Sequence, residues 1–507
     1  MPFDGLTIRA LCAELNNDLH DARVDKIHQP EKDEIVLSLR SRNGSCRLLL
    51  SANPRWSRLH LSSYKKDNPK NPPVFCMLLR KYLEGGKIKA IKQVDFERIV
   101  HIDIEAMDDF REWKNKRLIC EFTGRHSNII LINPDTNIII DAIKKFSSEQ
   151  NSYREVLPGK IYVAPPDQHK LNPLESSMEI FAQSMWSQSP DIALAAALFA
   201  VFTGISPFSA RQLCLQAGLD PELPVEQCGE YEFIRLYDRV TSLLVQLSQE
   251  KNKAEILLSG QQLIDYAPYN ILGIAPDYQV NSFESVNEAC DAFFGSKMEL
   301  LHLDSMKANL NRTLKNYLDK AYKKRFLQEG DLAAAHINEK YRVWGELLTS
   351  YAHQFKKGDT EIELADFYSG EYIKIQLDPR YTPIQNAQKY FKIYNKSRAA
   401  LKHLAQLMAQ NQEEIDYLES VMLAVNQAES TVHIEEIIEE LEHESYLKEH
   451  SRRKSKGEKT KPRHFTSSDG LEILVGRNNR QNDLLSLKLA GPQDLWLHAR
   501  QIPGSHV

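Results

Sequence analysis

The sequence predicts a multidomain α+β protein, with a mixed α/β N-terminal domain, a helical domain and a long antiparallel coiled coil. Three observations support this prediction. The chain has 507 residues, too many for one compact core, which suggests three or four domains of roughly 100–200 residues each. Its first third carries short runs of β-branched and aliphatic residues. Its middle third carries apolar residues at three- and four-residue steps.

Residues 1–172 form the first predicted domain. We expect an amphipathic helix over 8–19, because its apolar residues share one helical face. We expect a hairpin of strands over 34–40 and 46–50, because Asn43-Gly44 between them can adopt the positive φ of a tight turn. The other expected elements are a helix over 75–84 and strands over 99–105, 118–122, 128–132 and 137–141.

Residues 173–290 are predicted to be helical. An Ala/Leu-rich helix over 192–202 precedes Thr203-Gly204-Ile205-Ser206-Pro207 and a further helix. A tight turn that contains glycine can present backbone N–H groups to a phosphate. The same pattern also fits an ordinary turn between packed helices, so both interpretations stay open.

Residues 291–446 show the most regular pattern. Apolar seams over 303–355 and 401–425 predict two antiparallel helices that bury a narrow stripe against each other, with polar Asn411 in one seam position. Strand-like stretches around Ser369-Gly370 predict a small β tip between the helices. Arms of about 60 residues would span roughly 90 Å, which suits contact with distant points on a large partner.

The last part of the chain combines opposite charges. Residues 434–444 are acidic, and we expect them to form a solvated helix face. Residues 447–464 are expected to be a flexible basic linker, which can also contact phosphates. Residues 465–507 open an α+β domain that is small for an independent core. We therefore expect this domain to be truncated and to fold poorly.

Composition restricts the class of protein. With 42% hydrophobic and 26% charged residues, the chain has ordinary globular composition. Its seven cysteines never show C-x-x-C spacing, which argues against a disulfide framework or a structural zinc site and fits a reducing compartment. A signal-peptide pattern is missing, and no apolar run approaches the ~20 residues of a bilayer span. We expect a cytoplasmic protein without membrane partner, cofactor or metal.

Several motifs together resemble one family. In the first domain they are Phe3-Asp4-Gly5, Lys26-Ile27-His28-Gln29-Pro30, Phe75-Cys76-Met77-Leu78-Leu79-Arg80-Lys81 and Gly124-Arg125-His126-Ser127-Asn128. Further along they are Leu377-Asp378-Pro379, Asn386-Ala387-Gln388-Lys389-Tyr390-Phe391-Lys392, Val475-Gly476-Arg477-Asn478-Asn479-Arg480-Gln481-Asn482-Asp483 and Asp494-Leu495-Trp496-Leu497-His498-Ala499. Over essentially its whole length, the chain is similar to the bacterial NFACT family.

This resemblance implies a domain order. An NFACT-N domain, similar in fold to formamidopyrimidine-DNA glycosylases, would occupy residues 1–172, and a helix-hairpin-helix domain residues 173–290. A coiled-coil middle domain with its β tip would follow over 291–446, then the basic linker over 447–464 and an NFACT-R domain over 465–507.

The resemblance also implies a role in ribosome-associated quality control. The family binds obstructed large ribosomal subunits, through rRNA and ribosomal proteins, while these still carry peptidyl-tRNA. It recruits alanyl-tRNA for mRNA-free alanine tailing of the stalled nascent chain. Peptide-bond formation belongs to the ribosome, so we expect the chain not to be an enzyme. The long arm, the basic linker and the lack of a catalytic motif agree with this.

For tRNA engagement the family uses an adjacent Asp-Arg pair, which Glu97 and Arg98 match here with an acid one methylene longer. The guanidinium can clamp a phosphate or stack on a base, and the carboxylate can orient it or accept from a base edge. Neighbours on a regular strand point to opposite faces, so both can meet one ligand only at a strand end or bulge. Arg125 and His126 are a second candidate pair for tRNA, with a structural polar role as the alternative.

Other residues are candidate RNA contacts, namely Lys389, Lys392, Arg452, Arg453, Lys454, Arg477 and Asn479. Asn386, Gln388, Tyr390 and Lys392 open the returning arm, where a structural junction at the β tip is the favoured interpretation. The amide-rich loop over 478–482 suits turn capping as well as nucleic-acid contact, and we favour capping.

Two other functions fit parts of the sequence. An older name of the family suggests a surface adhesin that binds fibronectin, here a secondary partner at most, although the sequence shows no export signal. The glycosylase-like fold suggests a DNA-binding enzyme whose nucleophile is an N-terminal proline, and Pro2 is present. However, Phe3 stands where that family has a catalytic glutamate, and no four-cysteine zinc finger follows.

Overall fold

The computed structural model describes residues 3–108, 110–149, 153–249, 252–260, 262–448, 460–500 and 502–507. The chain divides into two compact units, Met1–Met298 and Glu299–Val507. None of the helices within the described ranges is both long and apolar enough to cross a bilayer. The multidomain α+β class predicted from the sequence is confirmed.

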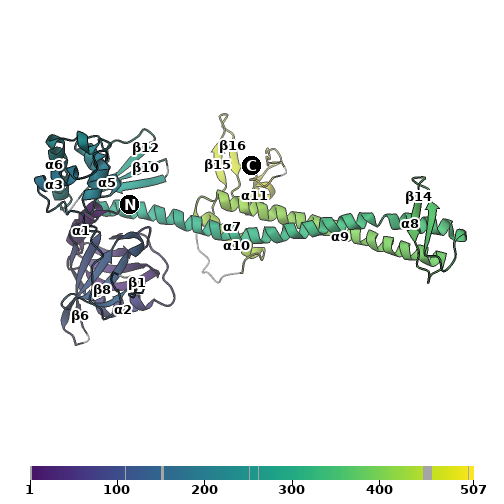
Figure 1. The fold of residues 1–507 in the computed structure, drawn as a ribbon, viewed down its shortest axis with the longest axis horizontal. Coiled ribbons are helices and arrows are strands. Elements are labelled where there is room, and N and C mark those ends of the chain that lie inside the picture. The colour runs from purple at the N-terminus through teal and green to yellow at the C-terminus, as the bar shows by residue number, and fades with distance from the viewer. Residues whose placement is uncertain are drawn as a thin grey trace. The chain divides into compact units, whose positions relative to one another are not determined.

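A nine-stranded antiparallel sheet dominates the first unit (Figure 1). The strands neighbour one another in the order β4 (Arg58–Leu61), β3 (Gly44–Ser51), β2 (Glu34–Ser41), β1 (Arg23–Glu31), β5 (Lys87–Gln93), β6 (Ile99–Met107), β7 (Trp113–Glu121), β8 (Asn128–Asn133) and β9 (Ile138–Ala142). The predicted hairpin is confirmed, but its turn is Arg42-Asn43, since Gly44 begins β3 opposite Ser41 and alone of these residues has a positive φ, at +116°. Sequence reasoning missed β1, β4 and β5, because charged residues interrupt their short apolar runs.

The sheet opens between β1 and β5, and helix α2 (Val74–Leu83) covers the freed edge of β1. Arg80 Nε donates to the carbonyl of Ile27 at 2.8 Å, and the Ile27 N–H donates to Glu84 Oε1 at 3.0 Å. A buried backbone group without a partner costs about 1–3 kcal/mol. The two side chains at the end of α2 therefore replace the strand that β1 lacks there.

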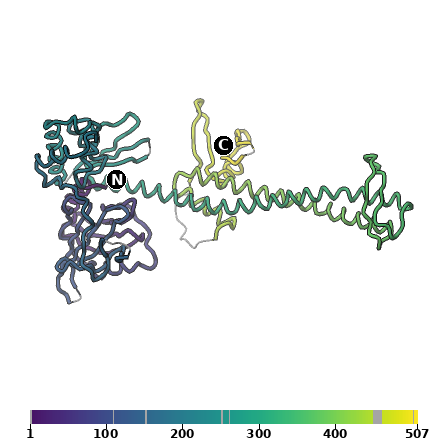
Figure 2. The backbone as a smooth tube through the Cα atoms, in the orientation of Figure 1, coloured from purple at the N-terminus to yellow at the C-terminus, as the bar shows by residue number. Residues whose placement is uncertain are grey.

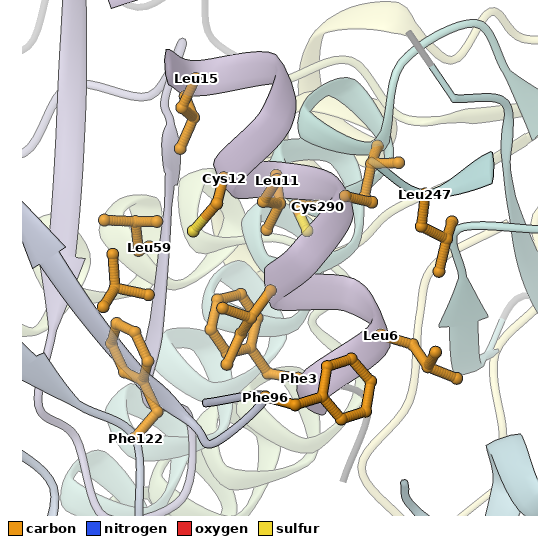
Figure 3. Close-up of a cluster of buried hydrophobic side chains, with 14 of the residues drawn as sticks. Phe3, Leu6, Leu11, Cys12, Leu15, Leu59, Phe96, Phe122, Leu247 and Cys290 are labelled. Carbon is orange, nitrogen blue, oxygen red and sulfur yellow. The ribbon is translucent and has the colours of Figure 1, made fainter. Parts of the chain in front are cut away.

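Helix α1 (Gly5–Leu19) is buried on opposite faces, as Figure 3 shows. Leu59 and Phe122 lie on one side of it and Leu247 on the other. A helix with apolar residues buried on opposite faces anchors the elements on both its sides. The sequence pattern located this helix, but its buried start at Gly5 lies three residues before the first apolar residue of the pattern.

Residues 173–290 are not wholly helical, so that prediction is wrong for 254–283. Helices α3 (Met178–Trp186), α4 (Leu194–Val201), α5 (Pro207–Gln216) and α6 (Glu230–Gln246) come first. A three-stranded sheet follows, with β10 (Ala254–Ser259) between β11 (Gln262–Ala267) and β12 (Tyr278–Phe283). Ala254 and Ile256 are buried while Glu255 between them is not, which is the period of two that marks a strand.

Helix α7 (Val286–Ile337) begins in the first unit, where Glu14 of α1 caps it. The Glu14 carboxylate accepts hydrogen bonds from the N–H groups of Val286 at 2.9 Å and Asn287 at 3.1 Å, and from the Ser285 hydroxyl at 2.8 Å. The first N–H groups of a helix have no partner within the helix, and a carboxylate there also interacts favourably with the helix dipole.

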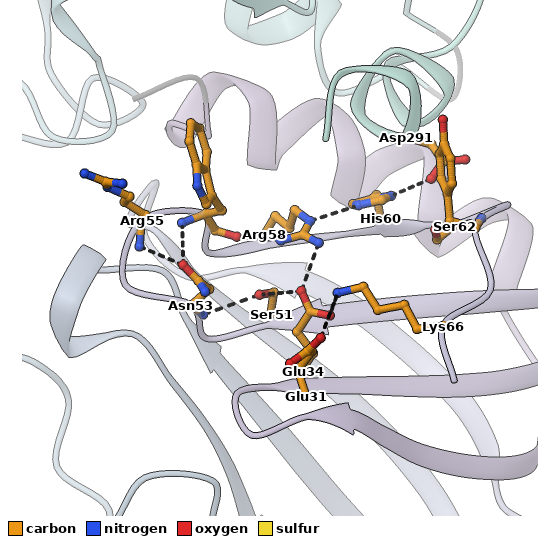
Figure 4. Close-up of polar contacts among 12 residues, drawn as sticks. Glu31, Glu34, Ser51, Asn53, Arg55, Arg58, His60, Ser62, Lys66 and Asp291 are labelled. Atoms are coloured by element: carbon orange, nitrogen blue, oxygen red, sulfur yellow. Dashed lines mark hydrogen bonds and ion pairs between the residues drawn. The ribbon is translucent and has the colours of Figure 1, made fainter. Parts of the chain in front are cut away.

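A buried polar network fixes β4 in the first unit (Figure 4). Arg58 donates to Glu34 at 3.0 Å, and Lys66 pairs with the other oxygen of Glu34 at 2.6 Å. Arg58 Nε also donates to His60 Nε2 at 3.3 Å, and His60 Nδ1 lies 3.6 Å from Asp291 of α7. Burial, together with the charge of Arg58, lowers the pKa of His60 to about 4, so the ring stays neutral and can accept from Arg58.

In the second unit, α7 and α9 (Pro383–Gln427) run side by side and antiparallel (Figure 2). Leu314 and Leu318 of α7 pack in one core with Ile415 of α9. In the buried seam, Asn411 Nδ2 donates to the carbonyl of α7 Ala321 at 3.0 Å. The predicted antiparallel helices and their polar seam position are confirmed. The β tip is confirmed as well, built from α8 (Lys340–Ser350), β13 (Glu361–Ala365) and β14 (Tyr372–Gln376).

The expectation of a solvated acidic face holds in part for helix α10 (Thr431–His443), since Glu435 and Glu439 are exposed while Glu440 is buried. Its apolar side is buried against α7 and α9, and its carboxylates hold the chain after residue 460. Glu436 accepts from both the N–H and the hydroxyl of Thr460 at 2.7 Å, and Glu440 accepts from Asn479 at 3.1 Å. The elements of this last segment are β15 (Arg463–Thr466), β16 (Glu472–Val475) and α11 (Asn479–Leu484).

Replacing Glu14 with alanine should lower the free energy of unfolding of the first unit by about 2–4 kcal/mol, because buried N–H groups at the start of α7 lose their acceptor. Urea denaturation of the full chain measures this. Asp18→Ala is the matched control, an exposed acid on the same helix, and should change stability by less than about 0.5 kcal/mol. Equal effects of the two substitutions would contradict the capping role.

Acid should destabilise the first unit through His60. The unfolded chain binds a proton at this ring below its ordinary pKa of 6.5, while the folded chain binds one only near pH 4. The unfolded state therefore binds more protons in this window, and the unfolding free energy should fall by about 2 kcal/mol from pH 7 to pH 5. Urea midpoints at both pH values test this. His60→Gln should reduce the slope by the share that this ring contributes, whereas His20→Gln, at an exposed histidine, should not.

Candidate nucleic-acid interface

Glu97 and Arg98 lie in the turn between β5 and β6, immediately before β6 begins. This strand end is a place where neighbouring side chains can reach one ligand. Both residues line a cavity of about 240 Å³. Its other lining residues are Phe3, Asp4, Gln168, Lys170, Phe199, Thr203, Gly204, Ile205, Ser206 and Pro207. The fold thus joins the predicted acid-base pair to the glycine-containing turn between α4 and α5.

Three backbone segments meet behind this cavity. The Gly5 N–H donates to the Gly204 carbonyl at 2.7 Å. Gly204 has a φ of +71°, and a Cβ there would lie 2.4 Å from the carbonyl oxygen of Phe96. Gln93 Nε2 donates to the carbonyls of Gly5 and Glu97, both at 3.0 Å. The turn that carries Glu97 is therefore held in place by contacts that only glycine permits at position 204.

Asp4 caps two helices at once. Its Oδ1 accepts from the Thr7 N–H of α1 at 3.0 Å. Its Oδ2 accepts from the Ser206 N–H at 3.3 Å and from the Ser209 hydroxyl at 2.5 Å, both at the start of α5. A phosphate at the N-terminus of α5 would compete with this buried carboxylate. The turn at 203–207 therefore acts in packing, and the structure favours the ordinary-turn interpretation.

The side chains that face the cavity carry both charges. The Thr203 hydroxyl donates to Glu97 Oε1 at 2.6 Å. Lys170 Nζ donates to the carbonyl of Phe199 at 2.6 Å and lies 4.1 Å from the centre of its ring. Burial and the nearby charge of Arg98 lower the pKa of Lys170, so two cations repel each other here. An anionic group in the cavity would relieve that repulsion.

Sequence reasoning missed Lys170, Gln168 and Phe199. Lys170 lies in a loop about 70 residues after Arg98 and reaches the cavity only through the fold. Phe199 belongs to the Ala/Leu-rich helix, whose apolar residues all resemble core residues in the sequence. No local pattern distinguishes these positions.

Arg125 and His126 lie in the short 3₁₀ turn Gly124–His126 that follows β7, and both are exposed. Arg125 Nε lies 3.3 Å from His126 Nε2. Neither is among the described residues that line the cavity. They share its end of the sheet, because the Phe122 N–H donates to the Arg98 carbonyl at 2.8 Å. Their contact with tRNA stays a prediction.

The residues at the start of α9 mostly build the β tip. Asn386 is buried, and its Oδ1 accepts from the Asp378 N–H at 2.9 Å, which confirms the structural junction. The Tyr390 hydroxyl donates to the Gln376 carbonyl at 2.5 Å. Lys389 lies 3.4 Å from Asp378, and Lys392 is exposed. RNA contact by the two lysines stays a prediction.

The amide-rich loop contacts α9 and α10. Asn478 caps α11, as expected for turn capping. Asn479 Nδ2 donates to Ser420 at 3.0 Å, and Arg477 lies 3.5 Å from Glu429. RNA contact by Arg477 and Asn479 stays a prediction. Arg452, Arg453 and Lys454 lie outside the described residues, as does Pro2, on which the glycosylase alternative depends.

Replacing Gly204 with alanine should collapse the cavity wall, because the new Cβ collides with the Phe96 carbonyl and strains a positive φ. We expect a loss of about 2–4 kcal/mol in the free energy of unfolding, measured by urea denaturation. Gly159→Ala is the matched control, since its φ is also positive, at +83°, but nothing lies within 4 Å of its Cβ position. That control should lose about 1 kcal/mol. Similar losses would contradict the steric argument.

Comparison with known proteins adds independent findings. A protein-family model described as NFACT N-terminal and middle domains matches residues 4–460. The chain is 37% identical over 510 residues to a Streptococcus suis protein named Rqc2 homolog RqcH, covering 100% of this chain and 86% of that protein. It is 34% identical over 516 residues to the Rqc2 homolog RqcH of Bacillus subtilis, covering 100% and 87%. The solved N-terminal part of the fibronectin/fibrinogen-binding protein from Streptococcus suis is 32% identical, covers 58% of this chain and 99% of that one, and has a TM-score of 0.48.

Proposed function

This chain belongs to the NFACT family, and on that premise we propose that it is a ribosome-associated quality control factor. Relatives that match it along its full length carry the name Rqc2 homolog RqcH. The proposed partners are an obstructed large ribosomal subunit with its peptidyl-tRNA and an incoming alanyl-tRNA. The outcome is mRNA-free addition of alanine to the stalled nascent chain.

The observation that carries this proposal is the cavity with Glu97, Arg98 and Lys170. Two cations that line one cavity suit the phosphate backbone of RNA, and arginine can also hold a phosphate by two parallel hydrogen bonds. The adjacent carboxylate accepts from donor groups such as base amines, which a purely phosphate-binding patch cannot do. A carboxylate beside two cationic side chains therefore supports recognition of a structured RNA such as tRNA.

In this proposal the protein binds and positions, and it forms no bond itself. Side-chain contacts at the cavity hold tRNA, while the peptidyl-transferase chemistry stays with the ribosome. The helical pair of α7 and α9, 52 and 45 residues long, offers extended surface for a large particle. Such a surface is more than a small-molecule site needs.

Replacing Arg98 or Glu97 with alanine should lower the amount of tRNA that co-purifies with the full chain about tenfold, because one charged contact to RNA is lost. Recovery of large-subunit rRNA should be unchanged. Sequencing of the co-purified RNA measures both. Arg55→Ala is the matched control, an exposed arginine of the same unit away from the cavity, and should leave tRNA recovery unchanged.

Wild-type tRNA recovery with both alanine variants would remove Glu97 and Arg98 from the site. Cell fractionation tests the wider proposal. Recovery of the protein solely in the cell wall, with none on large ribosomal subunits, would contradict quality control and favour the fibronectin-binding alternative.

A further inference from the structure

We infer that Thr203 is the positioning residue of the Glu97–Arg98 site and that it makes this site depend on glutamate, rather than aspartate, at position 97. The hydroxyl of Thr203 holds one oxygen of the Glu97 carboxylate and so fixes where the other can meet a ligand. This inference rests on the proposed function, since it concerns how the same site binds RNA.

The position of the Thr203 hydroxyl is fixed by its surroundings. Thr203 is 5% exposed and lies between buried Phe202 and the constrained Gly204. Its N–H donates to the Leu171 carbonyl at 3.0 Å, and the Leu171 N–H donates to the Val201 carbonyl at 2.9 Å. The backbone on either side of Thr203 is thus tied to the segment that carries Lys170. The hydroxyl has little freedom to follow a carboxylate that moves away.

The backbone of Glu97 is fixed as well. Its N–H donates to the Val94 carbonyl at 2.7 Å, and its carbonyl accepts from Gln93 at 3.0 Å. The distance between the two backbones is therefore set, and the side chain of residue 97 must span it. Glutamate does so, with 2.6 Å between Oε1 and the hydroxyl oxygen.

Aspartate at this position would fall short. Removing one methylene withdraws the carboxylate by about 1.5 Å, the length of one carbon–carbon bond, and leaves a gap of about 4 Å to the hydroxyl. That gap is beyond hydrogen-bond distance. The family resemblance places aspartate at this position, so the longer acid of this chain is explained by its partner on the α4–α5 turn.

The held carboxylate has a consequence for binding. With Oε1 bonded to Thr203, the carboxylate has less freedom to rotate, and its second oxygen can accept from a donor group of the ligand. Preorganisation of this kind reduces the entropy that binding must remove. A carboxylate without this anchor rotates more freely, so binding must remove more of its conformational freedom.

The test measures the affinity of full-length protein for a pool of total tRNA, with wild type, Thr203→Val, Thr203→Ser and Glu97→Asp. Valine keeps the shape but lacks the hydroxyl, so the affinity should fall about tenfold, the equivalent of one hydrogen bond to a charged group. Serine keeps the hydroxyl and should stay within about twofold of wild type. Glu97→Asp should lose about tenfold, although it keeps the charge.

Thr203→Val should add no further loss in a chain that already carries Glu97→Ala, because the two residues act as one unit. If the valine variant fails to fold, Glu97→Asp decides alone, since residue 97 lies in a partly exposed turn. Wild-type affinity of either the valine or the aspartate variant would overturn the inference while Glu97→Ala still weakens binding. Full binding by Glu97→Ala and Arg98→Ala would instead refute the proposed site itself.

Discussion

The first unit depends on one requirement, that buried helix starts find acceptors for their N–H groups. Two carboxylates, the N-cap Asp4 and Glu14 of α1, provide these acceptors for three helices. Asp4 serves the starts of α1 and α5, and Glu14 serves the start of α7. Because Asp4 is the N-cap of α1 and Glu14 belongs to the same helix, α1 sets the distances among the three helix starts. The cavity beside Asp4 and the attachment of the long helix thus share a single scaffold.

This arrangement determines which groups remain for a ligand. A helix start is a ready anion site, but at α5 the negative charge comes from inside the protein. Glu97, Arg98 and Lys170 are then the charged cavity-lining side chains that the proposed function assigns to recognition. Side chains distinguish ligands better than backbone N–H groups do, because they combine acid and base in one place. The start of α5 therefore serves packing, and in the proposed function selectivity depends on Glu97 and Arg98 of the β5–β6 turn.

Sequence patterns found the elements whose signals are local. Asn43-Gly44 marked its hairpin because both residues can adopt positive φ, and Asn411 stood out because a polar residue in an apolar seam is rare. Sequence patterns missed contacts that only the fold creates. Glu436 and Glu440 look solvated in the sequence, yet they hold Thr460 and Asn479. For the site, Glu97 and Arg98 came from a family motif, while Lys170 and Thr203 carry no local signal.

Contacts that a side chain already makes within the chain also rank the RNA candidates of the second unit. A side chain that is half buried and bonded within the chain must give up those bonds before it can bind a phosphate. Asn479 donates to Ser420 and Glu440, so its release removes a hydrogen bond from a buried carboxylate. Lys389, half exposed and 3.4 Å from Asp378, forms a surface pair that contributes little to stability. It can exchange that pair for a phosphate at little cost. The start of α9 is therefore better suited to RNA than the amide-rich loop, whose groups already serve the packing of α11 on α10.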